Sequence, residues 1–518
     1  MPTYNNHENY KWRETQPGTW QRDADEAEVF YSTLVKLFAG SGRMHFAITG
    51  HVSITVSVPE GASPETSSRN LDKSLRVAWA RLRHQLPTLA SRVHYVVDEA
   101  KWKKTYQTIA DDVSRSAWLD ETFKIISTNQ TGAEWANSDP PAPEMATLFV
   151  VVPPTSTSSP SEIRRDLVLR SPHDITDGIG TLQLFNILVH RISDTLDQQL
   201  DLPTFDNSEI SRLSPPYRTA AAVPEQPTPK QSQKIAALRV PPQPVPSSIQ
   251  PIGIPFQSGP PLPGKHQRVS HTIPASQTKK LLTALKSLGA TPTHAFHAAI
   301  PMAVRDMYVQ ANPPSPTGEQ AKQVQYVNYI LRNERPSCVP PYNSPSHSAS
   351  VYHSVSGAKL AVIMDRSIPD SNSERNQEFL RILEEIKSFY LDVKDDKDHF
   401  ALAPYIWENS IPEINYPSSS DSGSWEGLNP VPKPNEKPSV SISSMGLIDR
   451  LIDSQVGNVS VSQPWVTGEE LGTGLGLFLG TFRGELELSA AYNDAWHGKE
   501  EVQGFLSRCE EIVFGYVG

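Results

Sequence analysis

The segment from Arg170 to Gly180 reads Arg-Ser-Pro-His-Asp-Ile-Thr-Asp-Gly-Ile-Gly. A strand pattern, Asp166 to Arg170, leads directly into it, and a strongly apolar helix pattern, Leu182 to Leu196, follows it. At a strand-to-helix junction, side chains can reach a cleft, and the first N–H groups of the helix lack intrahelical partners. This segment is therefore predicted to be a loop that carries polar side chains into a functional site.

Three residues of this loop suit a chemical role: His173, Asp177 and Gly178. An imidazole exchanges a proton near neutral pH, so His173 is a candidate general base acting on a hydroxyl or an amine. Asp177 can fix the loop through backbone N–H groups or an arginine, and Gly178 allows a tight turn. The alternative is a structural histidine at the end of a strand, which is the commoner case for a histidine in this position.

Composition narrows the class of protein. The chain has 518 residues, with 47 Lys and Arg against 57 Asp and Glu, which gives a net charge of −10 and does not favour nucleic acid as a partner. Two cysteines, Cys338 and Cys509, cannot form a disulfide framework or a cysteine zinc site. The polar stretch from Met1 to Arg22 is not a secretory signal, and no run of about 18 apolar residues predicts a membrane span. We therefore expect a cytoplasmic protein.

Proline is over-represented. The 46 prolines make up about 9% of the chain, against a usual share of roughly 5%. Fifteen of them lie in the 61 residues from Pro203 to Pro263, a composition typical of an extended connector. Helix and strand patterns alternate on both sides of it, which predicts two α/β halves. The expected division is residues 1–202, a proline-rich crossover at 203–270, and residues 271–518.

The segment His173 to Gly178 has the pattern His-x-x-x-Asp-Gly, and three further segments match the same family. They are Leu82 to Arg92 (Leu-Arg-His-Gln-Leu-Pro-Thr-Leu-Ala-Ser-Arg), Ser443 to Gly446 (Ser-Ser-Met-Gly) and Ala491 to Asn493 (Ala-Tyr-Asn). The chain resembles the HxxxDG acyltransferase superfamily, which includes the plant BAHD enzymes, fungal trichothecene acetyltransferases and the condensation domains of peptide synthetases. This resemblance implies two chloramphenicol-acetyltransferase-like domains, each a mixed β-sheet with flanking helices, in a pseudo-twofold arrangement around a tunnel.

The N-terminal region narrows the resemblance. Tyr10 to Trp12, Pro17 to Arg22 and Gly40 to Arg43 are similar to the N-terminus of trichothecene 15-O-acetyltransferases and their fungal relatives. Two departures matter. The Asp-Phe-Gly-Trp-Gly motif of BAHD enzymes is absent, and Pro172 replaces the first histidine of the condensation-domain motif. The second departure favours a stand-alone enzyme with a soluble thioester donor.

The resemblance implies a reaction and a site. His173 is expected to act as general base while a hydroxyl attacks acetyl-CoA, a co-substrate, with no permanently bound cofactor and no covalent acyl-enzyme. Asp177 is expected to pair with an arginine of the other half, Arg332 first and Arg335 second. Backbone N–H near Gly178 is one expected source of oxyanion stabilisation.

Ser443 and Ser444 are the other candidate oxyanion donors, and both are expected to line the tunnel; a solvated strand surface is their alternative. The acceptor is expected to be a small-molecule alcohol, a terpenoid such as a trichothecene with a C-15 hydroxyl, and the enzyme a monomer. An N-acylating or carrier-protein-fed condensation-type enzyme, and a non-catalytic ligand-binding paralogue, are the alternatives.

The remaining motifs give weaker evidence of function. His294 and His297 lie three residues apart on an expected helix, but no third ligand is suggested nearby, so no metal site is predicted. A Gly-x-Ser-x-Gly motif is absent, which disfavours a serine hydrolase. The short basic segment Lys101 to Lys104 is expected to be a solvated turn, with contact to CoA phosphates as its alternative.

Overall fold

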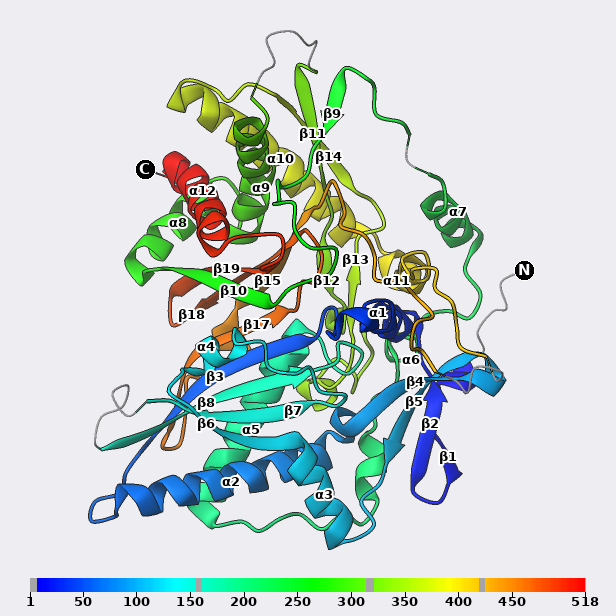
Figure 1. Ribbon diagram of the computed structural model, residues 1–518, viewed down its shortest axis with the longest axis vertical. Helices are drawn as coiled ribbons and strands as arrows, with labels where there is room; N and C mark the ends of the chain where they lie inside the picture. The colour runs from blue at the N-terminus through cyan, green and yellow to red at the C-terminus, as the bar shows by residue number, and fades with distance from the viewer. Residues whose placement is uncertain (1–6, 155–160, 242, 314–320, 419–423, 518) are drawn as a thin grey trace.

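In the computed structural model, the chain folds into two lobes that stack along the long axis of the molecule (Figure 1). The structure describes residues 7–154, 161–241, 243–313, 321–418 and 424–517. We call the lobe that contains β3 (Ile48–Ser57) and α5 (Gly178–Gln198) the N-lobe. The lobe that contains α9 (Pro292–Ala311) and α12 (Lys499–Val517) is the C-lobe. Helix α1 (Glu26–Leu37) belongs to the N-lobe, lies at the interface between the lobes and contacts α11 (His399–Glu408).

A six-stranded mixed sheet forms the centre of the N-lobe. Its order is β16 (Gln455–Val456), β17 (Val459–Gly468), β3 (Ile48–Ser57), β8 (Glu162–Ser171), β7 (Thr147–Val152) and β6 (Phe123–Ser127). Val52, Ile54 and Val56 are buried on one face of β3, and Thr49, His51 and Ser53 on the opposite face are buried as well. Both faces of β3 are therefore covered by protein.

Two long helices cover this sheet. In α2 (Pro64–Gln85), an apolar stripe that includes Leu75 and Trp79 is buried. It packs on α5 (Gly178–Gln198), whose apolar face includes Phe185 and Leu188. The shorter helices α3 (Asp112–Thr122) and α4 (Gly132–Ala136) complete the lobe.

A second sheet extends the N-lobe. Its order is β1 (Arg13–Gln16), β2 (Thr19–Asp23), β5 (Lys101–Gln107) and β4 (Ser91–Val96). Strand β2 of this sheet ends just before α1 begins. The Asp25 side chain caps that helix by accepting a hydrogen bond from the Glu28 N–H. This cap begins the helix that separates the lobes.

The C-lobe contains three sheets. They are β10 (His266–Ile273), β19 (Glu485–Asn493), β18 (Leu475–Phe482) and β15 (Val440–Leu447); β14 (Leu360–Asp365), β11 (Gln323–Asn328) and β9 (Ile249–Pro251); and the pair β12 (Leu331–Asn333) and β13 (His353–Val355). Helices α8 (Ala275–Ser287), α9 (Pro292–Ala311), α10 (Asn372–Asp395) and α12 (Lys499–Val517) supply the rest of this lobe. Apart from β9 and the pair β12 and β13, these elements together bury one continuous apolar cluster.

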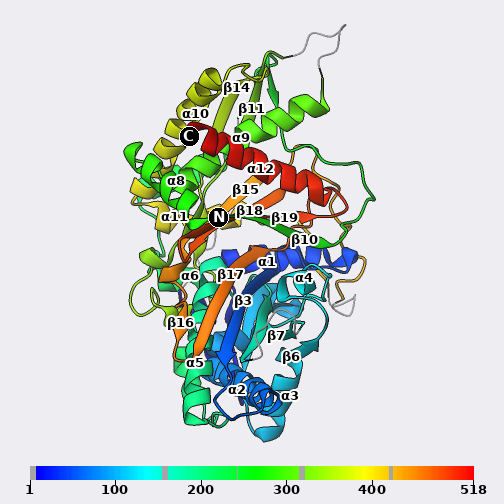
Figure 2. The ribbon, with the colours of Figure 1, turned by 90° about the vertical axis from the view of Figure 1, so that its left-hand side faces the viewer.

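One strand of the N-lobe sheet comes from the part of the chain that follows the C-lobe strand β15. Strand β17, which follows β15 of the C-lobe along the chain, lies antiparallel to β3 in the N-lobe sheet, with Trp465 opposite His51. Figure 2 shows orange β17 beside blue β3. The N-lobe sheet is thus built from both sides of the proline-rich segment, and the division at residues 203 and 271 stays a prediction.

The proline-rich segment is not wholly extended, contrary to expectation. It contains the short helix α6 (Tyr217–Ala220) and the ten-residue helix α7 (Pro229–Leu238). Pro229 occupies the first turn of α7, where a missing N–H costs nothing, and Thr228 caps the helix by accepting from the N–H of Gln231. Proline thus starts this helix, and no proline follows until Pro241.

None of the helices within the described ranges combines the length and the hydropathy needed to span a bilayer.

Candidate active site

The loop from Pro172 to Asp177 connects β8 to α5, as predicted, and is fixed at both ends. The Ile175 N–H donates to the Pro172 carbonyl at 3.3 Å, and the Thr176 hydroxyl donates to the Ser348 carbonyl of the C-lobe at 3.1 Å. Asp177 is the N-cap of α5 and accepts from the Gly180 N–H at 2.8 Å. The loop therefore belongs to the interface between the lobes.

Arg335 is the arginine that pairs with Asp177. Its Nη1 lies 2.8 Å from each carboxylate oxygen of Asp177, and both side chains are buried. The Tyr352 N–H donates to the same carboxylate at 2.9 Å. Burial alone would raise the pKa of Asp177, but the charge of Arg335 and the contact with His353 hold this pKa well below its ordinary value.

The first-choice partner, Arg332, was therefore wrong, and the second choice, Arg335, is correct. Arg332 lies on β12, where its Nε is 3.2 Å from Glu334 and its Nη1 donates to the Val393 carbonyl. Arg335 opens the turn after that strand, and this turn directs its side chain into the interface. A strand followed by a tight turn cannot be resolved to the residue from sequence pattern.

His173 lies against aromatic rings from both lobes. Its ring stacks on Tyr31 of α1, with centroids 3.8 Å apart and planes 10° apart, and lies 5.2 Å from the ring of His353 of β13. Burial first, and the neighbouring His353 second, lower the pKa of His173 to about 3, although nearby backbone groups and Asp177 oppose them. Its Nδ1 is buried, so Nε2 is the nitrogen that can meet a substrate. The ring is neutral at physiological pH.

A cavity of about 220 Å³ contains His173 and is walled by both lobes. Ser443 and Ser444 of β15 line it, as predicted, and so does Gly178. Ser444 accepts a hydrogen bond from the Thr293 hydroxyl at 2.8 Å. Aromatic side chains make up much of the remaining wall: Phe30, Tyr31, Phe46, Tyr329, Trp407 and Phe478.

The two glycines of the loop are constrained differently. A Cβ on Gly178 would lie 3.0 Å from the end of the flexible Met445 side chain. A Cβ on Gly180 would lie 2.3 Å from the backbone oxygen of Ser348 and 2.7 Å from Arg335. The stricter requirement is at Gly180, which the motif does not include.

Sequence reasoning missed Tyr31 and His353. The Tyr31 hydroxyl and His353 Nε2 are 2.7 Å apart, and His353 Nδ1 is 3.8 Å from Asp177. Neither residue belongs to a local motif, and each reaches His173 from a different lobe. The packing of the lobes was the missing information.

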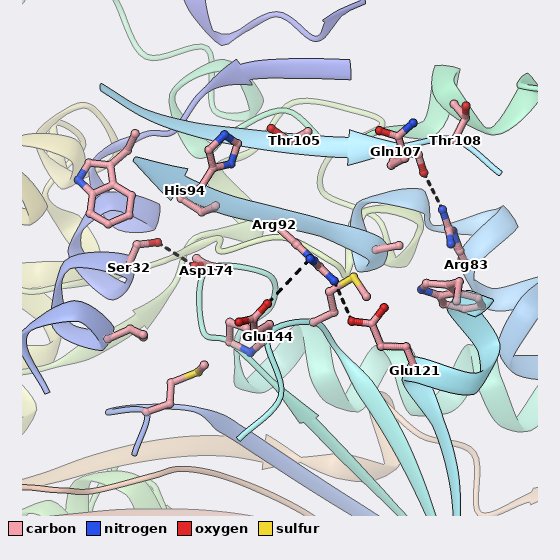
Figure 3. Close-up of a pocket in the computed structure, with 18 of the residues that line it drawn as sticks. Ser32, Arg83, Arg92, His94, Thr105, Gln107, Thr108, Glu121, Glu144 and Asp174 are labelled. Atoms are coloured by element: carbon pink, nitrogen blue, oxygen red, sulfur yellow. Dashed lines mark hydrogen bonds and ion pairs between the residues drawn. The ribbon is translucent and has the colours of Figure 1, made fainter. Parts of the chain in front are cut away.

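A larger cavity of about 860 Å³ lies on the other side of the loop (Figure 3). It meets the loop only at Pro172 and Asp174, and the described residues that line it do not line the cavity of His173. Figure 3 shows Arg92 between Glu121 and Glu144, and the Ser32 hydroxyl donating to Asp174. Because the His173 ring is outside it, we place the candidate active site in the smaller cavity.

The basic segment Lys101 to Lys104 is a strand rather than a turn. Lys104 is fully buried, 2.8 Å from Glu28 and 2.6 Å from the Asp174 carbonyl. Lys101 and Lys103 both pair with Asp23. These lysines stabilise the fold, and a contact with CoA phosphates is not needed to explain them.

The two histidines considered as metal ligands lie on α9, as expected. His297 Nδ1 is 3.2 Å from the Tyr390 hydroxyl, and the His294 ring contacts the same tyrosine. Elsewhere in the described ranges, His84, Asp206 and Glu209 bring potential ligand atoms within 4.8 Å of one another. The Arg212 guanidinium lies 3.4 Å from His84 in that group, and its positive charge disfavours a cation there.

Known proteins resemble the chain over nearly its whole length. It matches no protein-family model. It is 23% identical to the acetyltransferase pigO of Monascus ruber over 98% of both chains, and 25% identical to the O-acetyltransferase pigM of the same fungus over 97% of this chain and 86% of that one.

Solved structures share the fold. The TRI3 trichothecene 15-O-acetyltransferase from Fusarium sporotrichioides superposes with a TM-score of 0.75 at 17% identity, over 99% of this chain and 98% of that one. The condensation domain of the Monacolin K polyketide synthase MokA superposes with a TM-score of 0.56 at 13% identity, over 96% and 97%. The predicted chloramphenicol-acetyltransferase-like fold with two lobes is confirmed. With the His-x-x-x-Asp-Gly loop at the lobe interface and acetyltransferases among its relatives over nearly its whole length, the chain is similar to the HxxxDG acyltransferase superfamily in sequence pattern and in fold.

Proposed function

We propose that the protein transfers an acetyl group from acetyl-CoA to a hydroxyl of a secondary metabolite, with His173 as the general base. One observation carries this proposal: a neutral imidazole lies in a cavity between two lobes, on a loop that the pair Asp177–Arg335 holds in place. A neutral ring can accept a proton at once, and a fixed loop keeps it in one position.

The proposed step needs no covalent intermediate. His173 Nε2 takes the proton of the acceptor hydroxyl while the oxygen attacks the thioester carbonyl carbon. A C–O bond forms, the tetrahedral intermediate collapses, the C–S bond breaks, and the thiolate of CoA takes the proton back from His173. Base catalysis of this kind contributes about 10²- to 10⁴-fold.

The oxyanion of the intermediate needs hydrogen-bond donors. The hydroxyl of Ser443 is our first candidate, because it lines the cavity. Ser444 is the second, since its oxygen already accepts from Thr293. The backbone near Gly178 is a third source, because this glycine also lines the cavity.

The aromatic wall of the cavity supports an apolar acceptor. The relatives named above include acetyltransferases and a trichothecene 15-O-acetyltransferase, so a terpenoid with a C-15 hydroxyl is among the candidates. We infer that the enzyme works as a cytoplasmic monomer, because one chain supplies both walls of the cavity.

The purified protein tests this proposal with acetyl-CoA and a panel of alcohols and amines that includes a trichothecene with a free C-15 hydroxyl. We expect release of free thiol together with an acetyl ester identified by mass spectrometry. A His173→Ala variant that melts like the wild type should lose at least about 100-fold in turnover. Acylation of amines only, or near wild-type turnover of His173→Ala, contradicts the proposal.

A further inference from the structure

Two side chains outside the motif, one from each lobe, lie against His173. The Tyr31 ring of α1 stacks on the imidazole at 3.8 Å, and the His353 ring of β13 lies at 5.2 Å. Pro172 precedes His173, so the loop itself supplies no second histidine at that position. The second imidazole of this site comes from the C-lobe.

A series of contacts joins these side chains to the carboxylate that anchors the loop. His353 Nδ1 lies 3.8 Å from Asp177 Oδ2, and His353 Nε2 lies 2.7 Å from the Tyr31 hydroxyl. The negative charge of Asp177 favours the tautomer with the proton on Nδ1, which leaves Nε2 to accept from Tyr31. Burial, and then the charge of Asp177, raise the pKa of Tyr31 well above its ordinary value, so its hydroxyl keeps the proton it donates.

The His353 segment is itself held in place. The Trp407 indole N–H donates to the His353 carbonyl at 3.2 Å, and the preceding Tyr352 N–H donates to Asp177. Asp177 thus fixes its own loop, the strand that carries His353 and, through His353, the ring of Tyr31.

We propose that Tyr31 and His353 are positioning residues that set the plane of the His173 ring. The inference rests on the proposed function, in which Nε2 of His173 must face the acceptor hydroxyl. A ring stacked on a neighbour cannot turn about its Cβ–Cγ bond without losing that contact, and Tyr31 cannot turn while His353 accepts its hydrogen bond. A small misplacement of a reacting group costs about 100-fold in rate.

Four variants test this role. The amide oxygen of glutamine can reach the position of a histidine Nε2 and accept from the Tyr31 hydroxyl, whereas asparagine is too short to do so. We therefore expect His353→Asn and Tyr31→Phe each to lower kcat by about 10- to 100-fold with little change in the KM for acetyl-CoA, and His353→Gln to keep most of the activity. The double variant Tyr31→Phe with His353→Asn should lose no more than either single change, because both break the same contact.

Melting temperatures close to that of the wild type are required of each variant used. Wild-type kcat in Tyr31→Phe, or losses that multiply in the double variant, overturn the proposal.

A second readout separates this proposal from the proposed function. In protein with ¹⁵N-labelled histidine, Tyr31→Phe should shift the ring nitrogens of His353, since Nε2 loses its donor. Unchanged His353 resonances contradict the positioning role even if no acceptor is turned over. If the wild type acylates no acceptor but the His353 resonances shift as expected, the proposed function is contradicted. The hydrogen bond between Tyr31 and His353 is then still supported.

Discussion

One guanidinium nitrogen of Arg335 lies 2.8 Å from both carboxylate oxygens of Asp177, and the pair joins the loop from Pro172 to Asp177 to the C-lobe. Removing one partner leaves the other as a buried, unpaired charge, which costs about 3–5 kcal/mol. We expect Asp177→Asn to lower the free energy of unfolding by about this amount and to abolish most activity. Denaturant unfolding and thiol release measure the two effects.

Arg332 provides the matched control for that experiment. Its side chain is 26% exposed and pairs with Glu334 outside the contact with Asp177. Arg332→Lys should cost less than about 1 kcal/mol, because lysine keeps the positive charge beside Glu334 and the Arg332 side chain is partly exposed to water. Equal losses in Arg332→Lys and Asp177→Asn argue against a special role for the pair with Arg335.

We expect the same substitution to alanine to destabilise the protein by different amounts at Gly178 and Gly180. Gly180→Ala places a methyl group 2.3 Å from a backbone oxygen, so the loop or the Ser348 segment must move. Gly178→Ala meets only the end of the Met445 side chain, which can rotate away. We expect a loss of about 1–3 kcal/mol or more for Gly180→Ala and a smaller loss for Gly178→Ala, measured by thermal unfolding. The reverse order is incompatible with the contacts described.

The pH dependence of the rate follows from the buried position of His173. Its pKa of about 3 keeps the ring neutral from pH 5 to pH 8, so kcat should show no acid limb near the ordinary histidine value of about 6.5. The other titratable or charged groups facing this cavity are Tyr31, Asp177, Tyr329, Arg332, Arg335, His353 and Glu470. If kcat falls to half its maximum near pH 6.5 as pH is lowered, in the wild type and in His353→Gln alike, the assignment of His173 as a neutral, buried base is contradicted.

Asp174 predicts a pH dependence of stability. Burial raises its pKa to about 6 against the opposing charge of Lys104. Between pH 4 and pH 6 the unfolded state releases this proton first, so Asp174 makes the wild type less stable as pH rises. Asp174→Asn removes the effect, and its unfolding free energy relative to the wild type should rise by up to about 3 kcal/mol from pH 4 to pH 7.

Glu28 provides a control in which the change of stability with pH has the opposite sign. Arg22 and Lys104 outweigh the effect of burial and lower the pKa of Glu28 to about 2, so its contribution to stability is present above about pH 4.5 and is lost as pH falls toward 2. Glu28→Gln should therefore lose stability relative to the wild type as pH rises. Parallel pH trends in Asp174→Asn and Glu28→Gln contradict both assignments.

Substituting the two serines of β15 one at a time distinguishes between the candidate oxyanion donors. Ser443→Ala should lower kcat by about 10- to 100-fold if its hydroxyl meets the developing charge. Ser444→Ala should have a smaller effect, because the oxygen of Ser444 already accepts from Thr293. Equal kcat values for Ser443→Ala and the wild type assign the oxyanion to backbone donors.

Local patterns in the sequence were enough to predict the loop and the fold class. His173 follows a strand and precedes an apolar helix, and both elements are where the pattern puts them. The same reasoning could not separate Arg332 from Arg335, because the turn after β12 decides which side chain enters the interface. It also missed α7, whose proline lies at the one helical position that tolerates it.

Contacts between the lobes were beyond sequence reasoning. Tyr31 and His353 reach His173 only because α1 and β13 both pack beside the loop. Strand β17 was equally unforeseen, since its pairing with β3 joins segments about 400 residues apart. Pairings of that range leave no periodicity in either segment.

The pairing of β17 with β3 has a consequence for synthesis on the ribosome. Strand β3 leaves the ribosome about 400 residues before its partner, residues 459–468, so one edge of β3 stays open while the intervening chain is made. An open edge in a sheet invites pairing with other chains. The N-lobe therefore cannot complete its sheet cotranslationally from its own residues, and premature termination before β17 leaves an aggregation-prone product rather than an independent half-enzyme.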